Sequence, residues 1–375
     1  HTHALFTQEG FEVETLRLAL PPFSNFVDPR YLKNIAQKLY IEAHAEGFEY
    51  LSLGPAQTYN PEAYQRIPEA LAVSHDVFFS GMLTTPQGAV SLPAAKACAQ
   101  IIEQLAGLSP DGFANLNFCA SANVPSYAPF FPAAYAENAA PAFALAMEAA
   151  DLAVQVFSSA RSLEEARSIL VSEVENAAGK LEAAAQKLSR IYGYTFKGLD
   201  FTLAPFPEEN ASIARALESL GLPAFGLAGS VFASAFLTDT LDRARYTRTG
   251  FNGLMLPVLE DSGLAQRAAE GSLSATDLLL CSAVCGTGLD VIPLPGDTSA
   301  EQLYPLLLDV AALALRLNKP LTARLMPIPG KKAGDPTEFN FPYFANSRVM
   351  PLRAEKVTGL LAGSENVPIS ARYPR

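Results

Sequence analysis

The sequence contains few of the residues that build disulfide frameworks or membrane spans. Its 375 residues include only four cysteines, too few for a disulfide-stapled secreted fold. No run of about 18 apolar residues is free of breakers, and no signal peptide is visible. These absences predict a cytoplasmic protein that does not enter a membrane.

Charged residues are also scarce, at 17% of the chain against roughly 25% in an average soluble domain. Hydrophobic residues make up 49%, which excludes a disordered chain because such chains lack the apolar surface that offsets ordering entropy. The net charge is -11, and no basic stripe is present to bind a phosphate backbone, so we expect no nucleic-acid partner. The composition predicts a large core and a homo-oligomer whose subunit contacts cover further apolar surface.

Short apolar runs alternate with amphipathic helical patterns. Strands are expected at residues 12–20, 48–53, 77–83, 199–203, 253–259, 289–294 and 321–328. Helices are expected at residues 28–45, 91–105, 162–190, 208–220, 231–243, 263–270, 277–283 and 298–317. This alternation predicts a largely parallel sheet with helices packed outside it. No repeat or linker divides the pattern, so we expect one α/β domain over residues 1–375, with a peripheral C-terminal tail at 353–375.

Two helix starts carry clear capping signals. Ser162 and Glu165 have the spacing of a capping box, and the apolar positions that follow recur every three or four residues. Thr298 and Glu301 are expected to cap the helix that reaches Leu317. Both segments are interpreted as packing helices.

The segment around Cys285 is the most informative part of the sequence. CSAVCGTGLD (residues 281–290) ends an apolar helical stretch, turns on Gly286 and Gly288, and enters an extended apolar segment. A thiolate at Cys285 would be a nucleophile, and the amides of the glycine turn would hold an anion or oxyanion. The alternative is that Cys285 is a small buried hydrophobe, as free cysteines usually are. Zinc is not expected, because no histidine or third cysteine lies nearby.

Two acidic positions lie at strand ends beside this turn. Asp290 begins the strand after the turn, and Glu260 with Asp261 stands at another strand-to-helix junction. If they converge in space, they form either an acid/base pair or a site for a divalent cation. The alternative is that Asp261 caps the next helix. Only convergence in space would favour the functional interpretation.

A run of alternating polar residues precedes Tyr127. If residues 115–123 form a strand, Asn117, Cys119, Ser121 and Asn123 share one face of it. A polar strand face in an apolar protein usually lines a cavity or bonds to neighbouring backbone. The alternative is an antiparallel strand with one face in water. Asn117 and Asn123 are therefore candidates for substrate binding.

Four segments resemble a known family. They are GLDFTLAP (198–205), GFNGLMLP (250–257) with the following Glu260 and Asp261, SAVCGTGLD (282–290) and PFFPAAY (129–135). They are similar to the family called domain of unknown function 711, also known as uncharacterised protein family 0210 and often labelled pyruvate formate-lyase-like. The resemblance is dense over residues 198–352 and looser back to Phe11. Asn252, in the second segment, joins the predicted substrate-binding residues.

The resemblance implies an α/β barrel with outer helices, like that of glycyl-radical enzymes and ribonucleotide reductases. In those enzymes a central loop carries a catalytic cysteine, and Cys285 is the position that corresponds here. Two departures change the expectation. No C-terminal glycine stands in the setting that a glycyl radical requires, so radical chemistry of that type is not expected. In addition, Ala136 follows Tyr135 where the family pattern often has histidine, which weakens a nucleophilic role for Cys285.

Taken together, the sequence predicts an enzyme acting on a small polar or anionic metabolite. Cys285 would be the nucleophile or proton donor, and Asp290 or Glu260 would be the base or would bind a divalent cation. Gly286 and Gly288 would supply amides to an anion. The alternative is a non-catalytic ligand-binding or structural homo-oligomer on an inherited barrel, which the low charge fraction and Ala136 favour.

Overall fold

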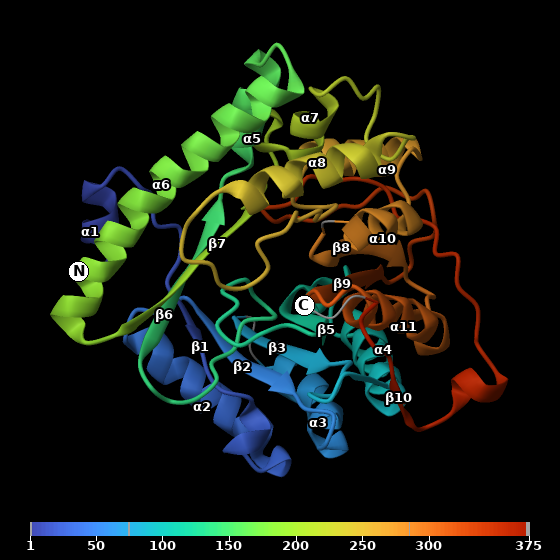
Figure 1. Cartoon of the computed structure of the whole chain (residues 1–375). Helices are drawn as coiled ribbons and strands as arrows, with labels where there is room; N and C mark the ends of the chain where they lie inside the picture. Colours follow the sequence, from blue (N-terminus) through green and yellow to red (C-terminus); the bar gives the residue numbers. More distant parts are fainter. Residues whose placement is uncertain (1, 74–75, 285, 373–375) are drawn as a thin grey trace.

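A six-stranded sheet forms the centre of the computed structural model, which describes residues 2–73, 76–284 and 286–372 (Figure 1). Its strand order is β1-β2-β3-β5-β9-β8. Neighbouring strands run parallel except β5 and β9, which are antiparallel. The strands are β1 (Arg17–Ala19), β2 (Tyr50–Ala56), β3 (Val77–Met82), β5 (Phe118–Ala122), β9 (Leu321–Ile328) and β8 (Gly288–Pro295). The predicted α/β class and parallel-rich sheet are confirmed.

Helices cover the outer face of this sheet. Figure 1 shows them following one another around the molecule, and α4 packs between α3 and α11. Their inner sides supply apolar residues to one continuous core that reaches from Phe6 to Met350. The helices are α2 (Leu32–Ala45), α3 (Pro61–Leu71), α4 (Leu92–Ala106), α10 (Ala275–Val284) and α11 (Ala300–Arg316).

A second, two-stranded sheet joins β6 (Ala142–Glu148) and β7 (Thr195–Ala204) in parallel. In Figure 1 this pair lies on the β1 side of the molecule, across the centre from β8 and β9. The helices on this side are α5 (Ala150–Ser159), α6 (Leu163–Tyr192), α7 (Ile213–Glu218), α8 (Ser230–Arg243) and α9 (Ser262–Glu270). The loops that connect these elements therefore lie between the two sheets.

The strands do not close into a barrel within the described residues. Isolated parallel bridges pair Leu199 with Arg248, Leu254 with Gly286, and Pro257 with Asp290, so residues 248–257 run between β7 and β8. On the other side, no strand pairing joins β1 to β6 in the described part of the chain. The predicted barrel is therefore corrected to an open arrangement of two sheets, because hydrogen bonding is continuous on one side only.

Short elements complete the described chain. Helix α1 (Thr2–Gln8) lies near the start, and β10 (Asn366–Pro368) pairs antiparallel with β4 (Ala89–Ser91), bringing the C-terminal segment onto the large sheet's helical side. Single 3-10 turns lie at Phe23–Asn25, Pro29–Tyr31, Phe113–Asn117, Glu209–Ala211 and Gly359–Ala362. Among the described residues, no helix is both long enough and apolar enough to cross a bilayer.

Helix caps explain two boundaries and correct one prediction. The Ser162 hydroxyl accepts the Glu165 N–H at 3.2 Å, which begins α6 as predicted, and Gly193 at φ +71° ends it. Helix α11 instead begins with a capping box of Ser299 and Gln302. The prediction of Thr298 and Glu301 was wrong by one residue, since both pairs have the same spacing and only the backbone turn selects between them.

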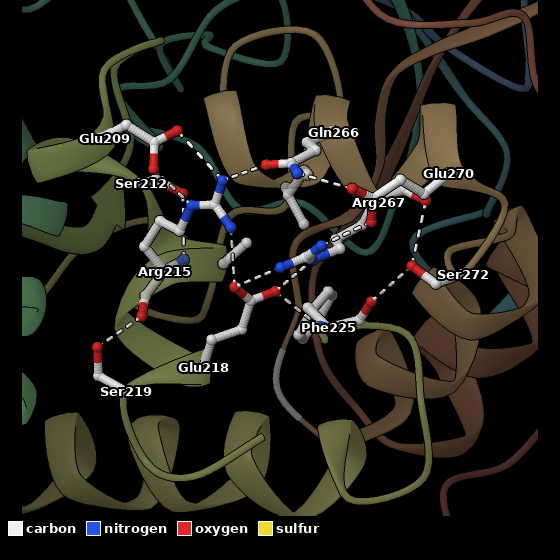
Figure 2. A network of polar contacts seen from close by, with 12 residues as sticks. Glu209, Ser212, Arg215, Glu218, Ser219, Phe225, Gln266, Arg267, Glu270 and Ser272 are labelled. Carbon is white, nitrogen blue, oxygen red and sulfur yellow. Dashed lines mark hydrogen bonds and ion pairs between the residues drawn. The ribbon is translucent and has the colours of Figure 1, made fainter. Parts of the chain in front are cut away.

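An ion-pair network ties α7 to α9 and is drawn in Figure 2. Glu218 lies at its centre and accepts hydrogen bonds from Arg267 Nε at 2.7 Å, from Arg215 Nη1 at 3.0 Å and from the Phe225 N–H at 2.9 Å. Burial alone would raise the pKa of Glu218, but the bonds from Arg267, Phe225 and Arg215 hold it below its ordinary value. The side chain is 12% exposed, so these bonds are poorly replaced by water.

Glu218→Ala is expected to lower the free energy of unfolding by about 2 kcal/mol, because the Phe225 N–H loses its acceptor and the partly buried Arg215 and Arg267 each lose one of their carboxylate partners. Urea denaturation followed by circular dichroism measures the effect. The matched control is Glu270→Ala, at the 44% exposed end of the same network, where we expect a much smaller loss because water replaces its contacts. Equal losses for the two variants would contradict the central role of Glu218.

Candidate functional site

The two faces of the large sheet differ in polarity. Residues two apart on a strand share a face, and residues paired in register lie beside one another on it. One face carries the pairs Leu51–Val77, Phe79–Phe118 and Ala120–Ala323, all in the apolar core under the helices. The opposite face carries the pairs Arg17–Tyr50, Ser52–Phe78, Ser80–Cys119 and Ser121–Thr322. The sheet therefore turns polar side chains toward the centre of the molecule.

A buried charged cluster lies at one end of this polar face. Arg324, two residues beyond Thr322 on β9, donates from Nε to Asp290 Oδ1 on β8 at 2.5 Å. Its Nη2 donates to both oxygens of Glu260, at 3.0 and 3.1 Å. The side chains of Arg324 and Asp290 are only 9% and 10% exposed, and that of Glu260 is 21% exposed. The structure thus brings the predicted Asp290 and Glu260 together, through an arginine that the sequence analysis did not name.

Burial and charge shift the proton affinities of this cluster. Burial raises the pKa of Glu260 to about 7; the Arg324 guanidinium opposes this shift and the Asp290 carboxylate adds to it. Burial alone would lower the pKa of Arg324, but Asp290 and Glu260 together raise it. Arg324 is therefore a permanent cation, whereas Glu260 exchanges a proton near neutral pH. A carboxyl group with such a pKa is suited to general acid or base catalysis.

Glu260→Gln is expected to flatten the pH dependence of stability. The carboxyl pKa is about 7 in the folded protein against an ordinary 4.5, so the folded state binds more protons between these values and stability falls as pH rises. Above about pH 7 this loss is complete. Glutamine does not titrate, so from about pH 5 to pH 8 the variant should gain about 2 kcal/mol relative to wild type.

Urea denaturation of both proteins across this pH range measures that difference. Glu103→Gln, on the exposed side of α4, is the control and should follow wild type within about 0.5 kcal/mol. A wild-type curve and a Glu260→Gln curve that run parallel would contradict burial of the Glu260 carboxyl group.

A small pocket opens beside Arg324 and Asp290. Its enclosed space is only about 20 Å³, and the empty space reaches about 290 Å³ only when the part open to solvent is included. The enclosed part has room for about one water-sized group. The polar part of its wall combines Asp290 and Arg324 with Thr287, Thr322 and Cys119. The rest of the wall is mostly apolar and comes from two loops: Phe130, Phe131, Pro132, Ala133, Phe251 and Met255. A ligand would therefore place one small polar group between these walls and extend into the part open to solvent.

A second group of charges lies on the Glu260 side of the cluster. Arg17 on β1 stands 5.3 Å from the ring centre of Tyr50 and 5.7 Å from that of Phe131, and it pairs with Glu14 at 3.6 Å. Burial among protein atoms and the neighbouring Glu14 raise the pKa of Glu148, at the end of β6, to about 8. Glu148 is nevertheless exposed to water. The Arg17 guanidinium, which opposes the rise in the Glu148 pKa, also lies over Phe131 of the pocket wall.

The cysteines occupy different settings. Cys119 lines the pocket, and burial raises its pKa to about 12, against the weaker opposite effects of Ser121 and Arg324. Cys98 and Cys281 are buried, which raises the pKa of each thiol. Cys285 lies outside the described residues, so its predicted role stays a prediction. The predicted polar strand face is found for Cys119 and Ser121, both on β5.

The three asparagines predicted to bind substrate lie elsewhere. Asn117 ends a 3-10 turn instead of continuing a strand, and its Nδ2 donates to the Val77 carbonyl at 3.0 Å. Asn123 is exposed beyond β5. Asn252 Nδ2 donates to the Thr249 carbonyl at 2.6 Å, and its Oδ1 accepts from the Tyr246 hydroxyl at 2.6 Å. The strand expected at residues 115–117 is corrected, because the chain coils there to satisfy buried backbone groups.

The buried carboxylate of Asp200 holds the start of the GFNGLMLP segment (250–257). Asp200 accepts the N–H groups of Phe251 at 2.7 Å and Asn252 at 2.9 Å, and the hydroxyl of Thr202. Burial raises the pKa of Asp200 to about 6 against the effect of these bonds. The clamp fixes Phe251 in the wall of the pocket. Asp200 and Asn252 are therefore positioning residues of the loop.

The glycine turn has its amide groups engaged within the fold. The Gly286 N–H donates to the Cys281 carbonyl at 3.4 Å, and the Thr287 N–H donates to the Leu254 carbonyl at 3.1 Å. Gly288, at φ +118°, lies where a Cβ would stand 1.9 Å from the Thr322 carbonyl oxygen. The glycines thus permit close pairing of β8 with β9, and the structure does not bring their amides together as an anion site.

Glu260 and its neighbour Asp261 have different roles in the structure. Asp261 is fully buried and accepts the Leu264 N–H at 2.9 Å, the Ile213 N–H at 2.6 Å and the Ser212 hydroxyl at 2.6 Å. The predicted alternative that Asp261 caps a helix is confirmed, and it serves α7 as well as α9. Among the residues that the structure describes, no group of three or more His, Cys, Asp or Glu side chains is placed to hold a metal ion.

Sequence reasoning missed Arg324, although the sequence carries a signal for it. LTARLMPI (321–328) reads as a buried strand, yet Thr322 and Arg324 occupy alternate positions in it. Arginine is rarely found inside a buried strand unless it is paired, so its presence there predicts acidic partners nearby. The two acids already suspected were the partners. Only the spatial neighbourhood of β8 and β9 shows the match.

Comparison with known proteins gives consistent matches along the chain. The model of the family described as Uncharacterised ACR (DUF711) matches residues 1–343. A UPF0210 protein of Pyrobaculum aerophilum is 33% identical over 347 aligned residues, covering 87% of this chain and 76% of the relative. A UPF0210 protein of Pyrobaculum arsenaticum is 31% identical with the same coverage. One from Lactobacillus delbrueckii subsp. bulgaricus is 27% identical and covers 97% of this chain and 85% of the relative.

Proposed function

The chain belongs to the family described as Uncharacterised ACR (DUF711), and we propose that it is an enzyme acting on a small polar metabolite. The carrying observation is the cluster of Glu260, Arg324 and Asp290 beside a pocket. A buried ion pair adds little to stability compared with apolar residues of the same size. Such a cluster is therefore more readily explained by chemistry than by folding.

Each member of the cluster has a role in this proposal. Asp290 and Arg324 face the pocket and bind the substrate. Glu260, with its pKa of about 7, lies on the other side of Arg324 and does not line the pocket. It exchanges its proton with water there, which changes the net charge of the cluster. Cys285 stays the proposed nucleophile or proton donor, because it precedes the pocket residue Thr287 by two positions. This division of tasks needs no metal ion.

The test of catalysis is turnover of pooled small metabolites in D₂O, followed by proton NMR with the full chain. We expect wild type to transform, or exchange a proton of, at least one metabolite. Glu260→Gln should slow that change and remove its pH dependence near pH 7, because Arg324 then loses its titrating partner. No change with wild type, or an unchanged rate in the variant, would overturn the proposal.

Alkylation of cysteines tests the proposed thiol separately. Cys98, Cys119 and Cys281 should resist iodoacetamide in the native protein at about pH 8, because burial raises the pKa of each. Cys285 should react much faster, with a midpoint below the reference value of about 8.5. Peptide mass spectrometry assigns the sites, and the urea-unfolded protein, in which all four react, is the control. An inert Cys285 would remove it from the mechanism.

The finer fold resemblance is also a proposal. We infer that the two sheets derive from a barrel of the kind found in glycyl-radical enzymes, with residues 248–257 as the link between β7 and β8. The gap between β1 and β6 is where such a barrel would have opened. An experimental structure that pairs these strands would support this origin, and one with unrelated strand order would refute it.

A further inference from the structure

We infer that the pocket takes a neutral ligand group with one hydrogen-bond acceptor beside one donor, as in a primary amide. The acceptor would bind Arg324 and the donor would bind Asp290. This inference rests on the proposed function, since it names the substrate class of the same pocket. It replaces the expectation of an anionic ligand with one argued from the charges that face the pocket.

Arg324 has more N–H donors than its protein partners accept. A guanidinium carries five N–H groups on three nitrogens. Nε donates to Asp290, and Nη2 donates to both oxygens of Glu260. Among the described residues, Nη1 has no hydrogen-bond partner, although the side chain is only 9% exposed and lines the pocket. Nη1 is not among the fully buried atoms that lack a partner in the described residues, so it is open to the pocket, where water or an oxygen of a bound molecule can accept from it.

Asp290 supplies the complementary atom. Its Oδ1 accepts from Arg324 Nε, while Oδ2 has no hydrogen-bond partner in the described part of the chain. Asp290 also lines the pocket and is 10% exposed. Oδ2 is likewise not among the fully buried atoms that lack a partner in the described residues, so it is open to the pocket and can accept an N–H or O–H from a ligand. The pocket therefore presents one donor position and one acceptor position on neighbouring strands.

The charges select against ions. Among the described residues, Arg324 is the one basic residue in the pocket wall, and Asp290 and Glu260 both contact it. Beyond the wall, Arg17 over Phe131 is paired with Glu14. An anion would meet the Asp290 carboxylate in the wall with Glu260 behind Arg324, and a cation would meet the guanidinium. A neutral group that both accepts and donates avoids both costs.

Size and wall chemistry limit the rest of the ligand. The enclosed space of about 20 Å³ admits only the polar end of a ligand, and the other atoms lie in the part of the 290 Å³ that is open to solvent. Phe131, Phe251 and Met255 offer apolar contact on the side away from the charges. The substrate class is therefore a short aliphatic amide or a urea-like compound, with its polar end toward Arg324.

Acetamide and acetate make a matched pair of probes, because they have the same shape and differ in charge. Saturation-transfer NMR on the full chain at about pH 8 should show acetamide binding at least tenfold tighter than acetate. Arg324→Lys, which lacks Nη1, should weaken acetamide at least fivefold. Asp290→Asn removes one negative charge and should reverse the order of the two probes.

Acetate binding as well as or better than acetamide in wild type would overturn the ligand class. Binding of neither probe, or acetamide binding that Arg324→Lys leaves unchanged, would overturn it as well. If Asp290→Asn does not fold, the wild-type ratio and Arg324→Lys still decide. Acetamide binding without any turnover in the metabolite screen would refute the enzyme and keep the ligand class, so the two failures are distinguishable.

Discussion

Arg324→Met is expected to lower the free energy of unfolding by about 3–5 kcal/mol at pH 8, the cost of removing one partner from a buried ion pair. Methionine fills a similar space, so the loss comes from the two carboxylates left behind. Asp290 is 10% exposed and Glu260 is 21% exposed, and neither has another cation in hydrogen-bond contact among the described residues. Urea denaturation measures the loss.

The pH dependence identifies the cause. Without the guanidinium, the unpaired carboxylates hold protons more tightly in the folded state than in the unfolded state, so the variant should lose more stability at pH 8 than at pH 5. Adding Glu260→Gln and Asp290→Asn to the same chain should restore part of the loss, because no buried charge then remains. Arg243→Met is the control: that residue is 54% exposed and pairs with Asp239, and its loss should stay below about 1 kcal/mol.

A loss below about 1 kcal/mol for Arg324→Met at pH 8 would contradict the desolvated cluster. So would a neutral triple variant that is less stable than Arg324→Met alone. Either result would also weaken the proposed function, since that function depends on charges held out of water. The experiment therefore tests the physical basis of the site before any substrate is known.

Much of the fold is predictable from the sequence because local patterns decide it. The apolar period of α6, with its cap at Ser162 and its end at Gly193, specifies a helix whatever surrounds it. Residues 115–117 show the limit of such reasoning. Polar and apolar residues alternate there as in a strand, yet Asn115 and Asn117 bond to the Ile102 and Val77 carbonyls, which are distant in sequence. Closure of the sheet is likewise a long-range property that no local pattern reports.

The candidate site was only half predictable, for the same reason. Asp290 and Glu260 stood out because acids at strand ends are conspicuous, and the structure places both on Arg324. Whether they would meet depended on β8 lying beside β9 and on Pro257 bridging to Asp290. Asn252 looked equally suitable for substrate binding, but its side chain is hydrogen-bonded to Thr249 and Tyr246. The residue type shows which side chains could take part in a reaction. Whether a side chain is free to do so depends on its hydrogen-bond partners in the fold.

Gly288→Ala is expected to cost more than about 4 kcal/mol or to prevent folding, for a reason that lies in the backbone. Gly288 has φ +118°, which L-residues rarely adopt, and an added Cβ would stand 1.9 Å from the oxygen and 2.7 Å from the nitrogen of Thr322. Both atoms belong to the backbone of β9, so relief requires β8 and β9 to separate. That separation would also pull Asp290 away from Arg324.

Gly221→Ala separates these two causes. Gly221 has φ +106°, close to that of Gly288, but nothing lies within 4 Å of the position its Cβ would take. It should therefore show the backbone strain alone, about 1–2 kcal/mol. If both alanine variants lose the same amount in urea denaturation, close packing of β8 on β9 is not what requires glycine at position 288. A much larger loss for Gly288→Ala would assign the glycine of the SAVCGTGLD segment to strand pairing, and with it the placement of the charged cluster.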